Sequence, residues 1–139
     1  MAAPVIVDAG PLVAFLVRRD RHHGWVREQF ARLATPLISC EPALAEAAHL
    51  IRRVGGTLDF LFEAMRRGRL SCPFRLEEEA DAVQRLLKRY GDRPVSLADA
   101  CLVRMAELYD SSPVLTLDQD FSVYRKNGRQ VIPLITPTG

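Results

Sequence analysis

Short runs of apolar residues recur along the chain, separated by longer stretches with helical periodicity. Within the runs, apolar and polar residues do not alternate, which is typical of strands buried on both faces of a parallel sheet. The pattern predicts five short strands, and the third is expected at an edge of the sheet because a proline follows it. The predicted strands are Val5–Val7, Leu37–Ser39, Leu70–Cys72, Val114–Leu117 and Val131–Ile135.

The stretches between these runs predict helices. The clearest is Leu76–Tyr90, where apolar residues recur at steps of three and four, with acidic residues in the first turn and basic residues in the last. The other predicted helices are Pro11–Arg18, His22–Ala34 (ended by Thr35-Pro36), Pro42–Val54, a helix from a cap at Thr57 to Arg67, residues 95–108, and a short helix near Phe121–Lys126. This alternation predicts one α/β domain over residues 1–139, a three-layer α/β/α fold with a parallel sheet of four or five strands between helices.

One residue in these helices conflicts with its surroundings. In the stretch VSLADACLVRMAEL, residues 95–108, Asp99 shares a helical face with Leu102, Val103 and Ala106. Carboxylates are seldom buried without a partner, because taking a charge out of water costs free energy. The sequence therefore indicates that something in the fold compensates the charge of Asp99.

Four acidic residues are predicted to converge on one edge of the sheet. Asp8 and Asp118 each come directly after a predicted strand, and Asp99 lies in the first turn of its helix. Glu46 lies about one turn into the helix that Pro42 opens. In right-handed βαβ units the helix N-termini lie at the carboxyl edge of the strands, which is where open α/β sheets bind ligands.

Such a cluster is unfavourable unless the charges are compensated. At a separation of ~5 Å and an effective dielectric constant of ~20, each pair of carboxylates costs roughly 3 kcal/mol, and the sum over four acids approaches the whole stability of a small domain. Either some of the carboxyls are protonated or divalent cations lie among them. Ligands that are all oxygen favour Mg²⁺ or Mn²⁺ over zinc. A cation held in this way typically generates a hydroxide-like nucleophile for phosphodiester cleavage.

Each acid also has an explanation that needs no metal. Asp99 stands three residues after Ser96, a spacing that matches a helix capping box. Asp8 is explained by an Asx turn at the end of its strand, and Asp118 by a cap on the following loop. Glu46 is also explained as an exposed helix residue paired with Arg53 or Arg52.

Three neighbouring residues are secondary candidates. Glu41, directly before Pro42, is expected to cap its helix and is the alternative to Glu46. Asp120 is expected to be the N-cap of the short helix that starts at Phe121, and it is a possible accessory acid. Thr116 lies in a predicted strand, and its hydroxyl could support the site.

Composition narrows the class of protein without naming a substrate. The chain has 139 residues and a net charge of +2, which is too small to indicate nucleic-acid binding by itself. The clusters Arg18/Arg19/Arg21, Arg66/Arg67/Arg69 and Arg125/Lys126/Arg129 are candidates for contacts with a polyanion. The three cysteines have no metal-ligand spacing. No signal peptide or membrane-spanning run is visible, so we expect a cytoplasmic protein with no membrane association.

Four stretches together resemble the PIN-domain nucleases, and among these the small toxins of the VapC type. They are VIVDAGPLVAFLV, LISCEPALAEAAHLI, VSLADACLVRMAEL and VLTLDQDFSVYR, in the order and spacing of the family. The resemblance implies strand order 3-2-1-4-5 and an acidic quartet of Asp8, Glu46, Asp99 and Asp118 that binds Mg²⁺ or Mn²⁺ and hydrolyses RNA. It also implies a homodimer and a small cognate antitoxin whose C-terminal tail lies in the active-site groove. One departure is Gly10, where many members carry Ser or Thr.

The sequence thus predicts a metal-dependent endoribonuclease that leaves 5′-phosphate and 3′-hydroxyl ends. Two alternatives remain at this stage. A non-catalytic PIN-fold module would bind RNA or protein without cleaving it. A receiver-like phosphoacceptor domain also places acids at this edge, but it normally has paired acids after its first strand and a lysine after its last, which this chain lacks.

Overall fold

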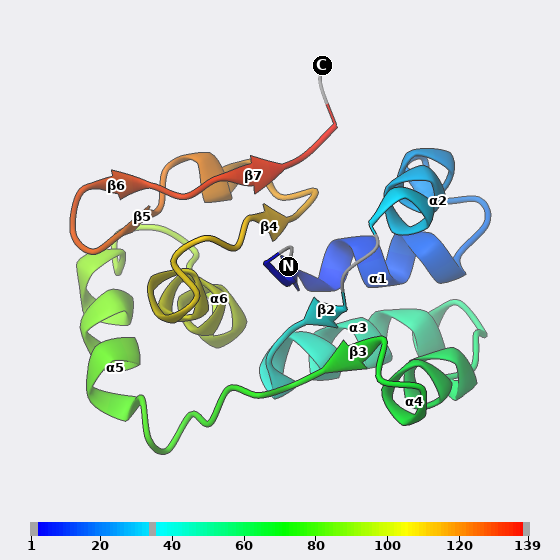
Figure 1. The fold of residues 1–139 in the computed structure, drawn as a ribbon, viewed down its shortest axis with the longest axis horizontal. Helices are drawn as coiled ribbons and strands as arrows, with labels where there is room; N and C mark the ends of the chain where they lie inside the picture. Colours follow the sequence, from blue (N-terminus) through cyan, green and yellow to red (C-terminus); the bar gives the residue numbers. More distant parts are fainter. Residues whose placement is uncertain (1–2, 34–35, 138–139) are drawn as a thin grey trace.

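A computed structural model describes residues 3–33 and 36–137, and within them the chain forms a parallel sheet of five strands. The order is β3-β2-β1-β4-β7, which confirms the predicted order because β7 is the fifth predicted strand (Figure 1). Each strand is shorter than predicted except the first, and β3 is an edge strand as expected. The strands are β1 (Val5–Val7), β2 (Leu37–Ile38), β3 (Leu70–Ser71), β4 (Val114–Leu115) and β7 (Leu134–Ile135).

Helices cover both faces of the sheet, as predicted. They are α1 (Ala9–Leu16), α2 (His23–Arg32), α3 (Glu41–Arg53), α4 (Asp59–Arg66), α5 (Ala80–Arg89) and α6 (Leu97–Leu108). Successive strand residues point to opposite faces: Ile6 and Val114 pack with α5 and α6, whereas Val7 and Leu115 pack with α1 and α4. Figure 1 shows α5 and α6 together on one side of the sheet and α1, α2 and α4 on the other.

The helices and the cysteines bear on the expectations of no membrane association and no cysteine metal site. In the part of the chain that the structure describes, no helix is long and apolar enough to cross a membrane. The cysteines are free thiols, with Cys40 and Cys101 buried and Cys72 partly exposed.

The C-terminal third differs most from the prediction. The predicted helix near Phe121–Lys126 is instead a short 3₁₀ helix, η1 (Gln119–Ser122), followed by β5 (Arg125–Lys126). β5 pairs antiparallel with β6 (Gln130–Val131). The connection contains Asn127 and Gly128 with φ angles of 50° and 84°, and Asn-Gly tolerates the positive φ that a tight hairpin requires. The predicted strand Val131–Ile135 is therefore divided between β6 in this hairpin and β7 in the main sheet.

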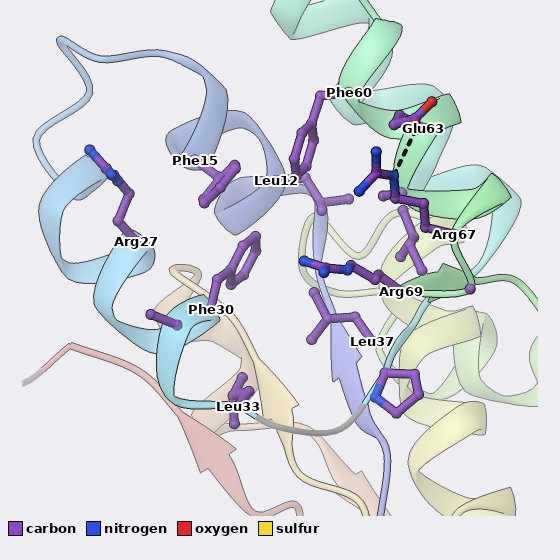
Figure 2. A pocket seen from close by; sticks show the side chains of 15 residues that line it. Leu12, Phe15, Arg27, Phe30, Leu33, Leu37, Phe60, Glu63, Arg67 and Arg69 are labelled. Carbon is purple, nitrogen blue, oxygen red and sulfur yellow. Dashed lines mark hydrogen bonds and ion pairs between the residues drawn. The ribbon is translucent and has the colours of Figure 1, made fainter.

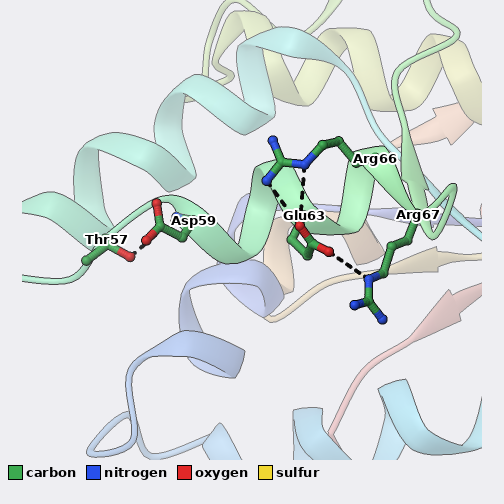
Figure 3. Close-up of polar contacts among 5 residues, drawn as sticks. All are labelled: Thr57, Asp59, Glu63, Arg66 and Arg67. Carbon is green, nitrogen blue, oxygen red and sulfur yellow. Dashed lines mark hydrogen bonds and ion pairs between the residues drawn. The ribbon is translucent and has the colours of Figure 1, made fainter.

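Several helix boundaries also differ. Residues 76–79 form a turn, so α5 begins at Ala80 and its first-turn acid is Asp81. α4 begins at Asp59, whose amide donates to the Thr57 hydroxyl at 3.3 Å (Figure 3). α1 begins at Ala9, two residues before the predicted proline. The predicted helix end at Ala34 and the break at Thr35 lie outside the described residues.

Candidate active site

Asp8 lies where β1 passes into α1. It is the N-cap of α1, its side chain is almost fully buried, and its Oδ1 accepts a hydrogen bond from the Ala9 amide at 2.7 Å. Its Oδ2 accepts a hydrogen bond from the Thr116 hydroxyl at 2.8 Å. Asp8 thus serves as a helix cap, but this role does not account for its second oxygen, which the buried hydroxyl of Thr116, directly after β4, holds in place.

Thr116 connects Asp8 to Asp118. While its hydroxyl donates to Asp8, the same oxygen accepts the Asp118 amide at 2.9 Å. Thr116 is completely buried, and its hydrogen bond to Asp8 is shielded from water. The hydroxyl that the resemblance leads one to expect at Gly10 is absent, and a Cβ there would meet Leu117 at 3.5 Å, which is ordinary contact. The hydroxyl that holds Asp8 comes from Thr116 instead.

Asp118 directly precedes η1 and caps it. Its Oδ1 accepts the Asp120 amide at 2.9 Å. The predicted role of Asp120 as N-cap is therefore wrong: Asp118 occupies that position, and Asp120 lies in the first turn of η1. Asp118 is partly exposed, which leaves it open to a ligand.

Asp99 lies in the first turn of α6 and forms the predicted capping box. The Asp99 amide donates to the Ser96 hydroxyl, and the Ser96 amide donates to Asp99 Oδ2, both at 3.0 Å. The Tyr124 hydroxyl lies 3.4 Å from the same Oδ2. Asp99 is only 8% exposed. The capping box therefore holds Asp99 in position at the start of α6, and its carboxylate also faces the Tyr124 hydroxyl.

The carboxylates of Asp8, Asp99 and Asp118 come together at this edge of the sheet. Each offers one oxygen such that the three oxygens lie within 4.8 Å of one another. Burial is the main cause that raises the pKa of Asp8 to about 6, and the nearby charges of Asp99 and Asp118 raise it further against the opposing hydrogen bonds. Burial likewise raises the pKa of Asp99. Full ionisation of the cluster is therefore unfavourable, mainly because the carboxylates are buried and to a smaller extent because they repel one another.

Glu46 lies near this cluster but outside it. It projects from α3 as an exposed side chain, and it is not among the acids whose oxygens converge within 4.8 Å. Partial burial and the charge of Asp99 raise the pKa of Glu46, while a hydrogen bond with Ser96 lowers it. The structure thus links Glu46 to the cluster through Ser96 and through charge. Among the described residues Glu46 forms no ion pair, so the expected pairing with a helix arginine is wrong.

Glu41, the alternative to Glu46, is exposed at the first position of α3. Cys40 is the N-cap, so the expected capping role of Glu41 is also wrong. Glu41 is not part of the carboxylate group either.

The three converging acids fit a hard divalent cation. They supply only oxygen ligands, which Mg²⁺ and Mn²⁺ prefer. Backbone amides or hydroxyls orient every carboxylate, as is usual for groups that surround a metal. A cation would also compensate the buried charge of Asp8, whose pKa is raised mainly by burial and further by the charges of Asp99 and Asp118. Sequence reasoning placed these three residues but missed Tyr124, whose contact with Asp99 depends on the course of the chain after Asp118.

A groove lies elsewhere on the molecule. It has a volume of about 690 Å³, and its lining comes mainly from α1, α2, α4 and β3, with none of the four acids among it (Figure 2). The Phe15 ring packs against Phe30 at 4.8 Å and Phe60 at 4.9 Å between centroids. Arg67, at its rim, pairs with Glu63 at 2.7 Å (Figure 3). The groove is thus an apolar surface edged with charge and separate from the carboxylates.

Comparison with known proteins identifies the family and supports the fold. Ribonuclease VapC26 of Mycobacterium tuberculosis (strain ATCC 25618 / H37Rv) is 27% identical over 127 residues, which cover 89% of this chain and 94% of the relative. The crystal structure of VapC20 of Mycobacterium tuberculosis, described as a Sarcin-Ricin loop cleaving toxin, matches with a TM-score of 0.71 at 20% identity, covering 86% of this chain and 93% of that one. The model of the PIN domain family matches residues 5–127. The resemblance inferred from the four sequence stretches is therefore confirmed, and this chain belongs to the PIN-domain family.

Proposed function

We propose that this protein is a metal-dependent endoribonuclease, the toxin of a toxin–antitoxin pair, acting as a single domain in the cytoplasm. The observation that carries the proposal is the convergence of Asp8, Asp99 and Asp118 within 4.8 Å at the carboxyl edge of a PIN-domain sheet. The relatives support it, since the similar curated protein is named a ribonuclease and the similar structure a toxin. A small antitoxin and a homodimeric assembly are part of the proposal.

The chain's own residues would act by holding and orienting. Asp8, Asp99 and Asp118 would hold Mg²⁺ or Mn²⁺, with Glu46 at the margin of the site. When bound, such a cation supplies Lewis acidity that lowers the pKa of a coordinated water and stabilises the leaving oxygen. Thr116 fixes Asp8 Oδ2 and the amide of Asp118, and Ser96 fixes Asp99. These contacts keep the carboxylates in position before any substrate arrives, which reduces reorganisation during the reaction.

Cleavage of a total-RNA pool by the pure protein tests this proposal. We expect discrete products with Mg²⁺ or Mn²⁺, bearing 5′-phosphate and 3′-hydroxyl ends, and no products with EDTA. Restoring the metal after chelation should restore the products. Cleavage that persists in EDTA would contradict the metal-dependent mechanism, because the acids alone offer no comparable nucleophile.

The placement of the arginine clusters bears on how RNA would bind. Arg19 lies beyond the C-terminal end of α1, whereas Asp8 caps the N-terminal end, and an eight-residue helix is about 12 Å long. Arg69 directly precedes β3, at the sheet edge opposite the acids. Arg93 instead lies three residues before Ser96, the N-cap of the helix that carries Asp99.

We therefore expect Arg93→Ala to weaken RNA binding more than Arg19→Ala does. Loss of one phosphate contact with single-stranded RNA should lower the slope of log K against log salt by about 0.7. Filter binding in EDTA at several salt concentrations measures this without cleavage. Equal slopes for the two variants would show that Arg93 makes no such contact.

A further inference from the structure

Tyr124 lies directly behind the carboxylate cluster. Its side chain is 1% exposed, and its ring packs edge-on against Tyr90 and Phe121 at centroid distances of 5.0 and 5.1 Å. Its hydroxyl lies 3.4 Å from Asp99 Oδ2, longer than the roughly 2.5–3.0 Å of most O–H···O hydrogen bonds. The ring is thus fixed by packing, and its single polar atom is directed at an acid of the candidate site.

A phenylalanine would fill the same space without a polar atom. Burying a hydroxyl is unfavourable unless it forms a hydrogen bond, and across residues 3–33 and 36–137 the Tyr124 hydroxyl has Asp99 as its hydrogen-bond partner. An ionised carboxylate can only accept hydrogen bonds, so the Tyr124 hydroxyl is the donor in this contact.

The contacts of Asp99 are unequal between its two oxygens. Oδ2 receives the Ser96 amide at 3.0 Å and faces the Tyr124 hydroxyl. In the described part of the chain Oδ1 has no hydrogen-bond donor. Ser96 approaches from the start of α6, whereas Tyr124 comes from the segment that follows Asp118. Oδ2 is thus held from two elements, and Oδ1 is left for a ligand.

We propose that Tyr124 is a positioning residue for the candidate metal site: its hydroxyl holds Asp99 Oδ2, so that Oδ1 stays available to a divalent cation shared with Asp8 and Asp118. Because Tyr124 belongs to the segment that begins at Asp118, it also fixes the relative placement of two of the three acids. The inference rests on the proposed function, since it presupposes that the three acids bind a cation.

Tyr124→Phe tests this role because it removes the hydroxyl and keeps the ring. Tyr90→Phe is the matched control: Tyr90 belongs to the same aromatic cluster and is also buried, but its hydroxyl accepts the Arg125 amide at 2.9 Å and touches no acid of the site. Mn²⁺ affinity is measured by calorimetry for the wild type and both variants, and the melting temperature Tm is measured in EDTA.

We expect Tyr124→Phe to raise the Kd for Mn²⁺ about tenfold, the lower end of what loss of an outer hydrogen bond to a metal ligand costs. Tyr90→Phe should leave the Kd unchanged. Unchanged Mn²⁺ affinity in Tyr124→Phe, beside a wild type that binds, would overturn the positioning role alone. An equal loss in both variants would overturn it too, because packing would then be the cause. A wild type that binds no Mn²⁺ would overturn both this inference and the proposed function.

Discussion

Asp8→Asn should abolish RNA cleavage and, in EDTA at neutral pH, make the protein more stable. The expected loss of activity exceeds about 100-fold, because even outer partners of metal ligands are worth 10- to 100-fold. Asp99→Asn should behave in the same direction. A gain in stability that accompanies a loss of function is the signature of a site whose charges oppose folding.

The stability gain follows from the environment of Asp8. Its pKa of about 6, compared with an ordinary 3.8, means that its ionised form destabilises the metal-free fold by about 3 kcal/mol. Asparagine removes that charge and keeps an oxygen that can accept the Ala9 amide. Asparagine has a single side-chain oxygen, so it cannot accept the Ala9 amide and the Thr116 hydroxyl on separate oxygens as Asp8 does. We therefore expect a net gain of about 1–3 kcal/mol, which raises Tm by several degrees.

Thermal unfolding in EDTA measures the stability of the metal-free protein, and thermal unfolding in Mg²⁺ measures the stability gained when the cation binds. The wild type should gain stability when Mg²⁺ is added, by about 2.7 kcal/mol at a hundredfold excess over Kd, whereas Asp8→Asn should not respond. Asp81→Asn, at an exposed acid in the first turn of α5, is the control and should cleave RNA normally. Contaminating metal is first removed from Asp8→Asn and Mg²⁺ is then added. If the variant still cleaved RNA under these conditions, the site assignment would be wrong.

The convergence of Asp8, Asp99 and Asp118 could be predicted because each acid is tied to an element that the apolar pattern identifies. Asp8 and Asp118 follow buried strands, and parallel strands end at a common edge. Asp99 follows Ser96 at capping-box spacing, which fixes its place at the start of a helix. Strand order came from the resemblance, since periodicity does not specify which strands are neighbours.

Glu46 and Tyr124 show where sequence reasoning fails. The buried face of α3 runs through Ala43, Ala47 and Ile51 in steps of four residues. Glu46, one residue before Ala47, lies beside this face and its side chain is exposed. Phe121 and Tyr124 are three residues apart, which resembles a helical face. In the structure both are buried, but Phe121 lies in η1 whereas Tyr124 follows it, directly before β5.

The metal-free protein should lose stability as the pH rises from 5 to 7.5. An acid whose pKa is higher in the folded state than in the unfolded chain contributes stability that is complete below the unfolded value and is lost as the pH passes the folded value. For Asp8 these values are 3.8 and about 6, and the raised pKa values of Asp99 and Glu46 act in the same direction. Glu63, whose pKa is lowered by Arg67 and Arg66, contributes the opposite sign, but below its ordinary value of 4.5 and therefore outside this range.

Divalent cations should reverse this trend, because protons and metal compete for the same oxygens. Mn²⁺ affinity, measured by calorimetry, should increase from pH 5 to pH 7.5 and level off above the pKa of Asp8. In EDTA, the Tm of the wild type should fall over the same pH range. The Tm of Asp8→Asn should fall less, because this variant lacks the carboxyl whose pKa is raised to about 6. A wild-type Tm in EDTA that rises steadily toward pH 7.5 would contradict this account. The three carboxylates would then be compensated within the fold itself, and their convergence would no longer require a cation.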